Sequence, residues 1–219
     1  MRDPSGLAHV RRLGARSLPV VAREGRYVIG QDLDHVAEFV GLPGTGHTPL
    51  PPARLAALWI DVLRAAQRYV RQMPAGLLSE RPVADRDRST GTLAHHVFRV
   101  AEAFLDTVTS GGEYAEQMAN LPPPRGVGGS AAAIAEYGDR VLDRLETWRR
   151  QIEGGSCRER VVTYYGPQTV HQLLERSTWH SAQHVRQLIA VLDRCGIEPD
   201  GRLTTQDLAG LPLPERLFE

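Results

Sequence analysis

The stretch STWHSAQHVRQL, residues 177 to 188, places His180 and His184 four positions apart in a segment whose apolar residues follow helical spacing. The segment begins near residue 168, after a Gly-Pro pair, and ends near residue 194, before a glycine. Residues four apart on a helix lie about 40° from each other, so their side chains can converge on one point. The stretch therefore predicts a long amphipathic helix that carries two candidate metal ligands on one face.

Three earlier segments show the same periodicity of apolar side chains, and they cover residues 53 to 73, about 90 to 109 and about 130 to 152. Each is about as long as a helix of a four-helix bundle. The sequence therefore predicts a mainly α protein whose body, residues 53–195, is an up-down four-helix bundle. A short β-type run, Val161 to Tyr165, lies between the third and the fourth helix.

A smaller subdomain is expected before the bundle, at residues 1–43. The runs LPVVA and RYVIG are joined by REG, which predicts a hairpin, and helical spacing follows. The order helix, strand, strand, helix resembles the C-terminal half of a glutaredoxin or thioredoxin domain, with Pro19 at the place of the family's cis-proline. No CxxC loop is present, so the resemblance implies a redox-inert, partial α/β subdomain. Residues 44–52 are expected to form a linker, and residues 196–219 a tail that packs on the body.

The composition excludes several classes of function. The 219 residues have a formal net charge of zero and a pI near 7.1, so no basic or acidic surplus indicates nucleic acid or a membrane surface as a partner. All 26 basic residues are arginine, which is typical of a GC-rich bacterial genome. No apolar run approaches the roughly 18 residues of a membrane span, and a cytoplasmic protein is expected. Cys157 and Cys195 are not in a CxxC pattern and are interpreted as unpaired thiols.

A metal site needs at least one ligand besides His180 and His184. The second helix offers two neighbours, of which His96 shares the apolar stripe and His95 aligns with the more polar side, so we choose His96. The zincin motif HExxH is excluded because Ser181 follows the first histidine. An HxxxH pair also occurs by chance on solvated helix faces, which is the alternative interpretation. Histidines on the core stripes of two helices are costly as bare polar groups and sensible as ligands.

The segments TLAHHVFRVAEAF, residues 92–104, and LLERSTWHSAQHVRQL, residues 173–188, together resemble the DinB-like metal-binding bundle family. That family carries one histidine on the second helix and HxxxH on the fourth. The resemblance covers about residues 53–195. It implies that His96, His180 and His184 bind a divalent metal, commonly zinc or nickel, with the remaining positions open to water.

The resemblance also implies an activity. Members of the family include S-transferases that use bacterial low-molecular-weight thiols and a mycothiol-dependent isomerase, so such a thiol is an expected co-substrate. The metal would hold the thiol as a thiolate, while the protein orients a small-molecule electrophile beside it. The candidate substrate-binding residues on the predicted helices are Arg99, Arg176, Ser177 and Trp179, and Tyr164 of the β-type run is a further candidate. The candidate outer partner of the ligands is Gln187.

Two other functions stay open at this point. A metal-dependent hydrolase would use the same three ligands to activate water, without a thiol. A stress-response module would hold the metal without turnover. Members of the family often pair through helix faces, so a homodimer is a further expectation.

Overall fold

The computed structural model describes residues 4–15, 17–44, 46–83 and 87–218. The chain divides into two compact units: residues 1–48 together with 162–167, and residues 49–161 together with 168–219. The second unit contains the predicted helical body. Within the described residues, no helix is both long and apolar enough to cross a membrane.

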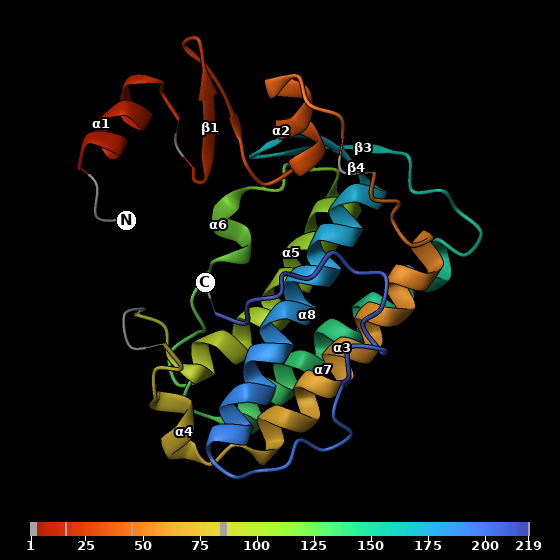
Figure 1. Cartoon of the computed structure of the whole chain (residues 1–219). Helices are drawn as coiled ribbons and strands as arrows, with labels where there is room; N and C mark the ends of the chain where they lie inside the picture. The colour runs from red at the N-terminus through yellow and green to blue at the C-terminus, as the bar shows by residue number, and fades with distance from the viewer. Residues whose placement is uncertain (1–3, 16, 45, 84–86, 219) are drawn as a thin grey trace. The chain divides into compact units, whose positions relative to one another are not determined.

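Four long helices form the body: α3 (Pro52–Gln72), α5 (Thr90–Ser110), α7 (Ala131–Gln151) and α8 (Val170–Arg194). Both α3 and α5 pack along α7 and α8, so α3 and α5 lie diagonally across the bundle (Figure 1). Two short helices, α4 (Ala75–Ser79) and α6 (Glu116–Ala119), lie in the connections. The prediction of a mainly helical bundle with a small α/β part is confirmed.

Helix boundaries follow from side-chain caps. The side chains of Ser89, Ser130 and Thr169 accept hydrogen bonds from the first-turn N–H groups of α5, α7 and α8. Thr169 forms a full capping box with Gln172. These caps fix where α5 and α8 begin, and therefore which of their residues face each other.

The directions of the helices differ from the predicted up-down order. Phe98 of α5 lies beside Gly138 of α7, and further along both helices Asp106 accepts a hydrogen bond from Arg144 at 2.8 Å. Because the partners come in the same order on both helices, α5 and α7 run in the same direction. The long connection over residues 111–130 permits this, as in bundles with a crossover connection.

The first unit contains α1 (Pro4–Arg12), β1 (Val20–Arg23), β2 (Arg26–Ile29) and α2 (Leu33–Val40). The two strands are antiparallel, with Val20 opposite Ile29. Asp32 caps α2, and Gly41 ends it in the left-handed conformation. The Leu18–Pro19 peptide bond is cis. The resemblance to half of a glutaredoxin stays a prediction.

A second hairpin is formed by β3 (Arg160–Thr163) and β4 (Gly166–Thr169), where the sequence predicted one β-type run. Its last residue is also the N-cap of α8. The hairpin therefore sets the start of the helix that carries the HxxxH pair.

Candidate metal centre

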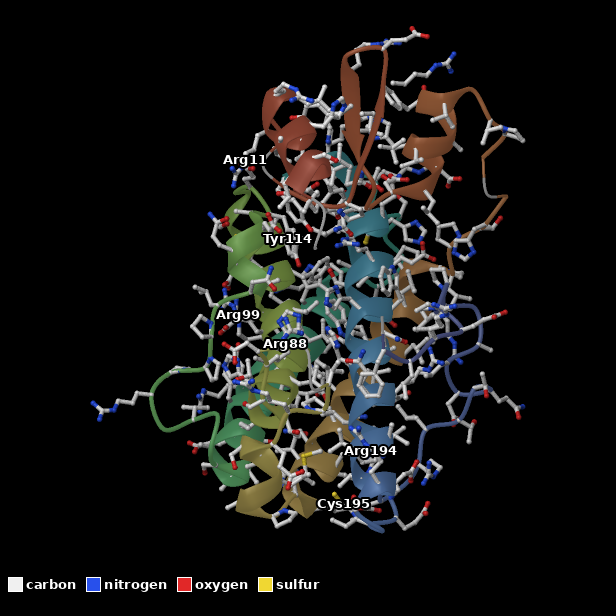
Figure 2. The ribbon with its side chains drawn as sticks, turned by 60° about the vertical axis from the view of Figure 1, so that its left-hand side comes forward. Arg11, Arg88, Arg99, Tyr114, Arg194 and Cys195 are labelled. Carbon is white, nitrogen blue, oxygen red and sulfur yellow. The ribbon has the colours of Figure 1, made fainter. Side chains whose placement is uncertain are left out.

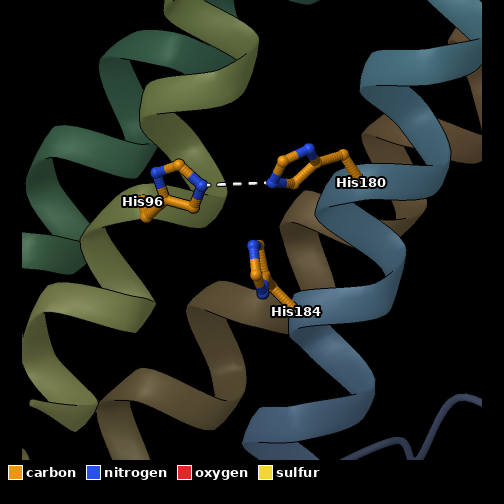
Figure 3. Close-up of side chains that lie close together, drawn as sticks. All are labelled: His96, His180 and His184. Carbon is orange, nitrogen blue, oxygen red and sulfur yellow. Dashed lines mark hydrogen bonds between the residues drawn. The ribbon is translucent and has the colours of Figure 1, made fainter. Parts of the chain in front are cut away.

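Three histidine side chains converge between α5 and α8 (Figure 3). His96 comes from α5, and His180 and His184 come from successive turns of α8. The Nε2 atoms of His96 and His180 are 3.2 Å apart, and one ring nitrogen from each of the three residues lies within 4.8 Å of the others. His96 is buried, and the other two are half-buried. The structure thus brings together the three ligands that the sequence indicated.

The arrangement fits a divalent metal by its donor set. Tetrahedral zinc with Zn–N bonds of about 2.0–2.1 Å separates its nitrogen ligands by roughly 3.3 Å, close to the 3.2 Å between His96 and His180. Three imidazoles suit zinc and nickel, and a three-ligand set leaves a coordination position for a substrate. Two imidazole nitrogens this close also need either a proton or a cation between their lone pairs.

His95 does not belong to the cluster. It is buried on another face of α5, where its ring stacks on Tyr137 of α7 with centroids 4.6 Å apart. The predicted choice between the two neighbouring histidines therefore agrees with the positions of their rings. The difference of about 100° between consecutive helix residues separates them.

The orientation of His184 is set from the C-terminal segment. Nε2 of Gln187 donates a 2.8 Å hydrogen bond to the Leu217 carbonyl, and Oε1 of Gln187 lies 2.7 Å from Nδ1 of His184. A carbonyl only accepts hydrogen bonds, so Gln187 must turn its amide NH₂ to Leu217 and its oxygen to His184. Nδ1 of His184 therefore carries the proton, and Nε2 keeps the lone pair that a metal requires.

The C-terminal segment is held along α8 by further contacts. Gln183 donates to the carbonyls of Arg216 and Leu217 at 3.0 and 2.9 Å, and Arg186 donates to the Pro214 carbonyl at 2.8 Å. The Arg194 guanidinium lies 5.5 Å from the ring centre of Phe218. The segment is thus a fixed neighbour of the histidine site.

Burial and nearby charges favour the neutral forms of His96 and His180. Burial lowers the pKa values of His96 and His180 well below the usual value, and the nearby His184 lowers them further. The positive charge of Arg88 lowers both pKa values, and that of Arg176 lowers the pKa of His180. A hydrogen bond with the backbone of Ala119 acts in the opposite direction on His96. His96 and His180 are therefore held neutral in a positive field.

A protein-family model described as the DinB superfamily matches residues 47–188. This range covers more than half of the chain and contains all three histidines. The chain belongs to the DinB superfamily. A search among curated proteins found no match. Membership in the superfamily and the three-histidine cluster together support a metal-binding protein.

Two predicted substrate-binding residues of this DinB protein lie beside the cluster. The ring of Trp179 stacks on that of His180 with centroids 5.8 Å apart, and the Arg176 guanidinium lies 5.8 Å from the ring centre of Trp179. Cation, indole and imidazole thus form a continuous layer along α8. Ser177 is almost fully buried, and its hydroxyl has no hydrogen-bond partner among the described residues.

The other two candidates are in different surroundings. Arg99 donates a 2.6 Å hydrogen bond to the Met118 carbonyl and pairs with Glu102 and Asp106, so its guanidinium is engaged by these local contacts. Figure 2 labels Arg99 on α5. Tyr164 lies in the turn between β3 and β4, in the first unit, where its ring contacts Tyr165.

Sequence reasoning missed Arg88. It predicted a C-terminal tail that packs on the body, but not that this tail holds Gln187 beside the histidines. Arg88 directly precedes the N-cap of α5 and is labelled in Figure 2. Arg88 precedes His96 by eight residues, which is about two helical turns. Because Arg88 lies outside the helix, helical periodicity does not predict that it lies near His96. The segment that ends near Leu217 is irregular and likewise has no pattern that indicates its partner.

Proposed function

We propose that this protein is a metal-dependent enzyme that acts on a small anionic electrophile with the help of a low-molecular-weight thiol. It either transfers the thiol to the electrophile or uses the thiol to isomerise it. The metal, zinc or nickel, would be held by His96, His180 and His184. The observation that carries the proposal is a cluster of three imidazoles, two of them with strongly lowered pKa values, that lies within the field of two arginines. The proposal rests on the chemistry of this site and on what is known of the superfamily.

A divalent cation with three neutral ligands keeps its full charge and would stabilise a substrate thiolate at neutral pH. In the described part of the chain, no carboxylate belongs to the histidine cluster. A thiol has an intrinsic pKa of about 8.5, whereas water has about 15.7, so a thiol needs less help from a general base. The absence of a carboxylate from the cluster therefore favours a thiol over water as the nucleophile.

The surrounding residues favour an anionic electrophile. Arg88 and Arg176 both act on His180 through their positive charges. A carboxylate of the substrate placed in this field would be attracted, and a guanidinium can bind it in a bidentate manner. Trp179 offers a flat apolar surface next to His180 for the body of the substrate.

The test is a thiol-dependence assay with the metal-loaded protein. Mycothiol, bacillithiol and glutathione are each offered with a small carboxylate-bearing electrophile, such as a maleyl compound, and thiol consumption and substrate isomerisation are followed separately. We expect turnover only with a thiol present, and loss of turnover in His180→Ala. The control is His171→Ala on the same helix, because His171 bonds to the Leu50 carbonyl at 2.8 Å and lies outside the cluster.

Two outcomes would contradict the proposal. Equal turnover with and without thiol would indicate hydrolysis by the same site. Stoichiometric metal in the parent without turnover on any thiol and electrophile pair would indicate a binding module. Arg176→Gln supplies a further check, since we expect it to raise KM for the carboxylate substrate more than for its methyl ester.

A further inference from the structure

A second polar site lies on the α7 side of α5, apart from the three histidines. His95 is only 4% exposed, and among the described residues its Nδ1 atom is buried without a hydrogen-bond partner. Such an atom costs stability unless a ligand or a water satisfies it. The ring is fixed in place because it stacks on Tyr137 at 4.6 Å with an angle of 13° between the planes.

The charged residues around His95 form a rigid support. The Tyr137 hydroxyl donates to Glu102 at 2.5 Å, and Glu102 also pairs with Arg99 and Arg144. Arg99 in turn holds the Met118 carbonyl. These groups form hydrogen bonds and ion pairs with one another, and they hold Tyr137 in place against His95. Within this described network, Nδ1 of His95 is the atom without a hydrogen-bond partner.

A hollow of about 170 Å³ opens in front of His95 and Tyr137. This is below the roughly 300 Å³ typical of sites for drug-sized ligands, so only a small molecule fits. One wall is apolar and rich in proline, and it consists of Leu121, Pro122, Pro124, Val127 and Ala133. Leu121 is half exposed, which leaves apolar surface at the opening for a ligand to cover.

Arg140 supplies a cation to the lining of this hollow. Its guanidinium lies 5.9 Å from the ring centre of Tyr137. Its ion pair with Glu136 is 3.5 Å long, and both side chains are more than half exposed, at 63% and 76%. A pair this exposed is worth little, so an incoming carboxylate can compete for Arg140.

From these three elements we propose that the hollow binds a small hydroxy acid with a compact apolar body. The carboxylate pairs with Arg140, the body lies against the proline-rich wall, and the hydroxyl bonds to the imidazole of His95, which lines the hollow. The site is separate from the metal centre, and it does not depend on the function proposed above.

The first experiment is calorimetric titration of the metal-loaded, full-length protein with 3- and 4-hydroxybenzoate, which place the hydroxyl at two distances from the carboxylate. We expect saturable binding of at least one isomer at millimolar concentration or below. The matching amide, which lacks the charge, should bind about three- to fivefold more weakly, the ratio for one partly exposed ion pair. Absence of saturable binding for both isomers would overturn the proposal.

Variants locate the bound molecule. Ala133→Leu fills the hollow from α7 and should abolish binding, whereas Ala132→Leu, at an exposed neighbouring position, should not change it. Arg140→Gln should remove the preference for the acid over the amide, with Arg149→Gln on the same helix as its control. Thermal melts establish that each variant is folded. If Ala133→Leu binds as the parent does, or if Arg140→Gln keeps the preference, the proposal is wrong.

Two further variants separate this site from the metal centre and test His95. His180→Ala should bind the hydroxy acid as the parent does, and loss of binding there would place the carboxylate on the metal and overturn the proposal. His95→Phe keeps a stacked ring but removes both ring nitrogens. In His95→Phe we expect benzoate and the hydroxybenzoate to bind equally, while in the parent the hydroxyl strengthens binding. A hydroxyl effect that survives in His95→Phe would contradict the assignment.

Discussion

Nδ1 of His184 lies 2.7 Å from Oε1 of Gln187, and the same amide donates to the carbonyl of Leu217. A candidate metal ligand is therefore connected, through one side chain, to the C-terminal segment of the protein. Outer partners of this kind fix the tautomer and the orientation of a ligating histidine. The geometry predicts that metal affinity depends on Gln187 and on the segment that holds it.

Replacing Gln187 with Leu removes the acceptor for the His184 proton, so the ring can rotate or change tautomer. We expect metal affinity to fall by about 10- to 100-fold, the usual effect of losing such a partner. Competition with a chromophoric chelator measures the change. Gln187→Glu keeps an acceptor at this position, and it should retain more affinity than Gln187→Leu.

The matched control is Gln183→Leu. Gln183 donates to the Leu217 carbonyl, as Gln187 does, and also to the Arg216 carbonyl, and its side-chain oxygen accepts from Arg186. Gln183→Leu should therefore loosen the segment with a smaller effect on metal affinity. If the two leucine variants lose affinity equally, the segment acts as a whole and the specific role of Gln187 is refuted.

Much of the metal site could be predicted because it lies on regular helices. The phase of an α-helix relates His180 to His184, and it separates His96 from His95 by their different neighbours. Arg88 and Leu217 could not be found in this way, since they lie in irregular segments whose tertiary contacts leave no periodic signal. The contacts of Arg99 with Glu102 and Met118 also leave no periodic signal, and its role in binding a substrate stays a prediction.

The same distinction applies to the fold. Amphipathic periodicity, together with the Gly-Pro pair before the fourth helix and the glycine after it, located the four long helices to within about two residues. The shared direction of α5 and α7 depends on the long connection between them, whose course the sequence pattern does not encode. The proline-rich part of that connection also forms the apolar wall in front of His95.

The stability of the metal-free protein should decrease as the pH falls below about 6.5. Burial lowers the pKa values of His96 and His180 in the folded state, so the unfolded chain binds protons first. Their contribution is fully present above the unfolded pKa of about 6.5, and it is lost as the pH falls towards the depressed folded values. Melting temperatures of metal-stripped protein across this range test the prediction.

The pH effect has its own control. His180→Gln removes one of the two groups, and we expect a flatter dependence of the melting temperature on pH than in the parent. Because metal binding requires neutral imidazoles, loaded protein should keep its metal to a lower pH than exposed histidines would allow. Metal release centred at or above pH 6.5 would contradict the depressed pKa values.

The two thiols should differ in reactivity. Cys195 is exposed at the C-terminal end of α8, as labelled in Figure 2, while Cys157 is buried. Burial raises the pKa of the Cys157 thiol, and Glu159 raises it further, so less thiolate is present near neutral pH. We expect a thiol reagent to label Cys195 at least about tenfold faster. Cys195→Ser should leave one slow thiol, and two equal rates would refute this assignment.

At Gly138, α7 lies close against Phe98 of α5, and replacement of this glycine should destabilise the bundle. A Cβ atom at this position would lie 2.7 and 2.8 Å from Cε1 and Cζ of Phe98. Phe98 is fully buried and cannot move aside without displacing the core. Gly138→Ala should therefore lower the free energy of unfolding by about 1–3 kcal/mol, despite the better helix propensity of alanine.

The control is Gly76→Ala in α4, where a Cβ would meet no atom within 4 Å. This second change should be neutral or stabilising by up to about 1 kcal/mol. Urea unfolding of both variants measures the difference, and equal stability would show that Phe98 has room to adjust.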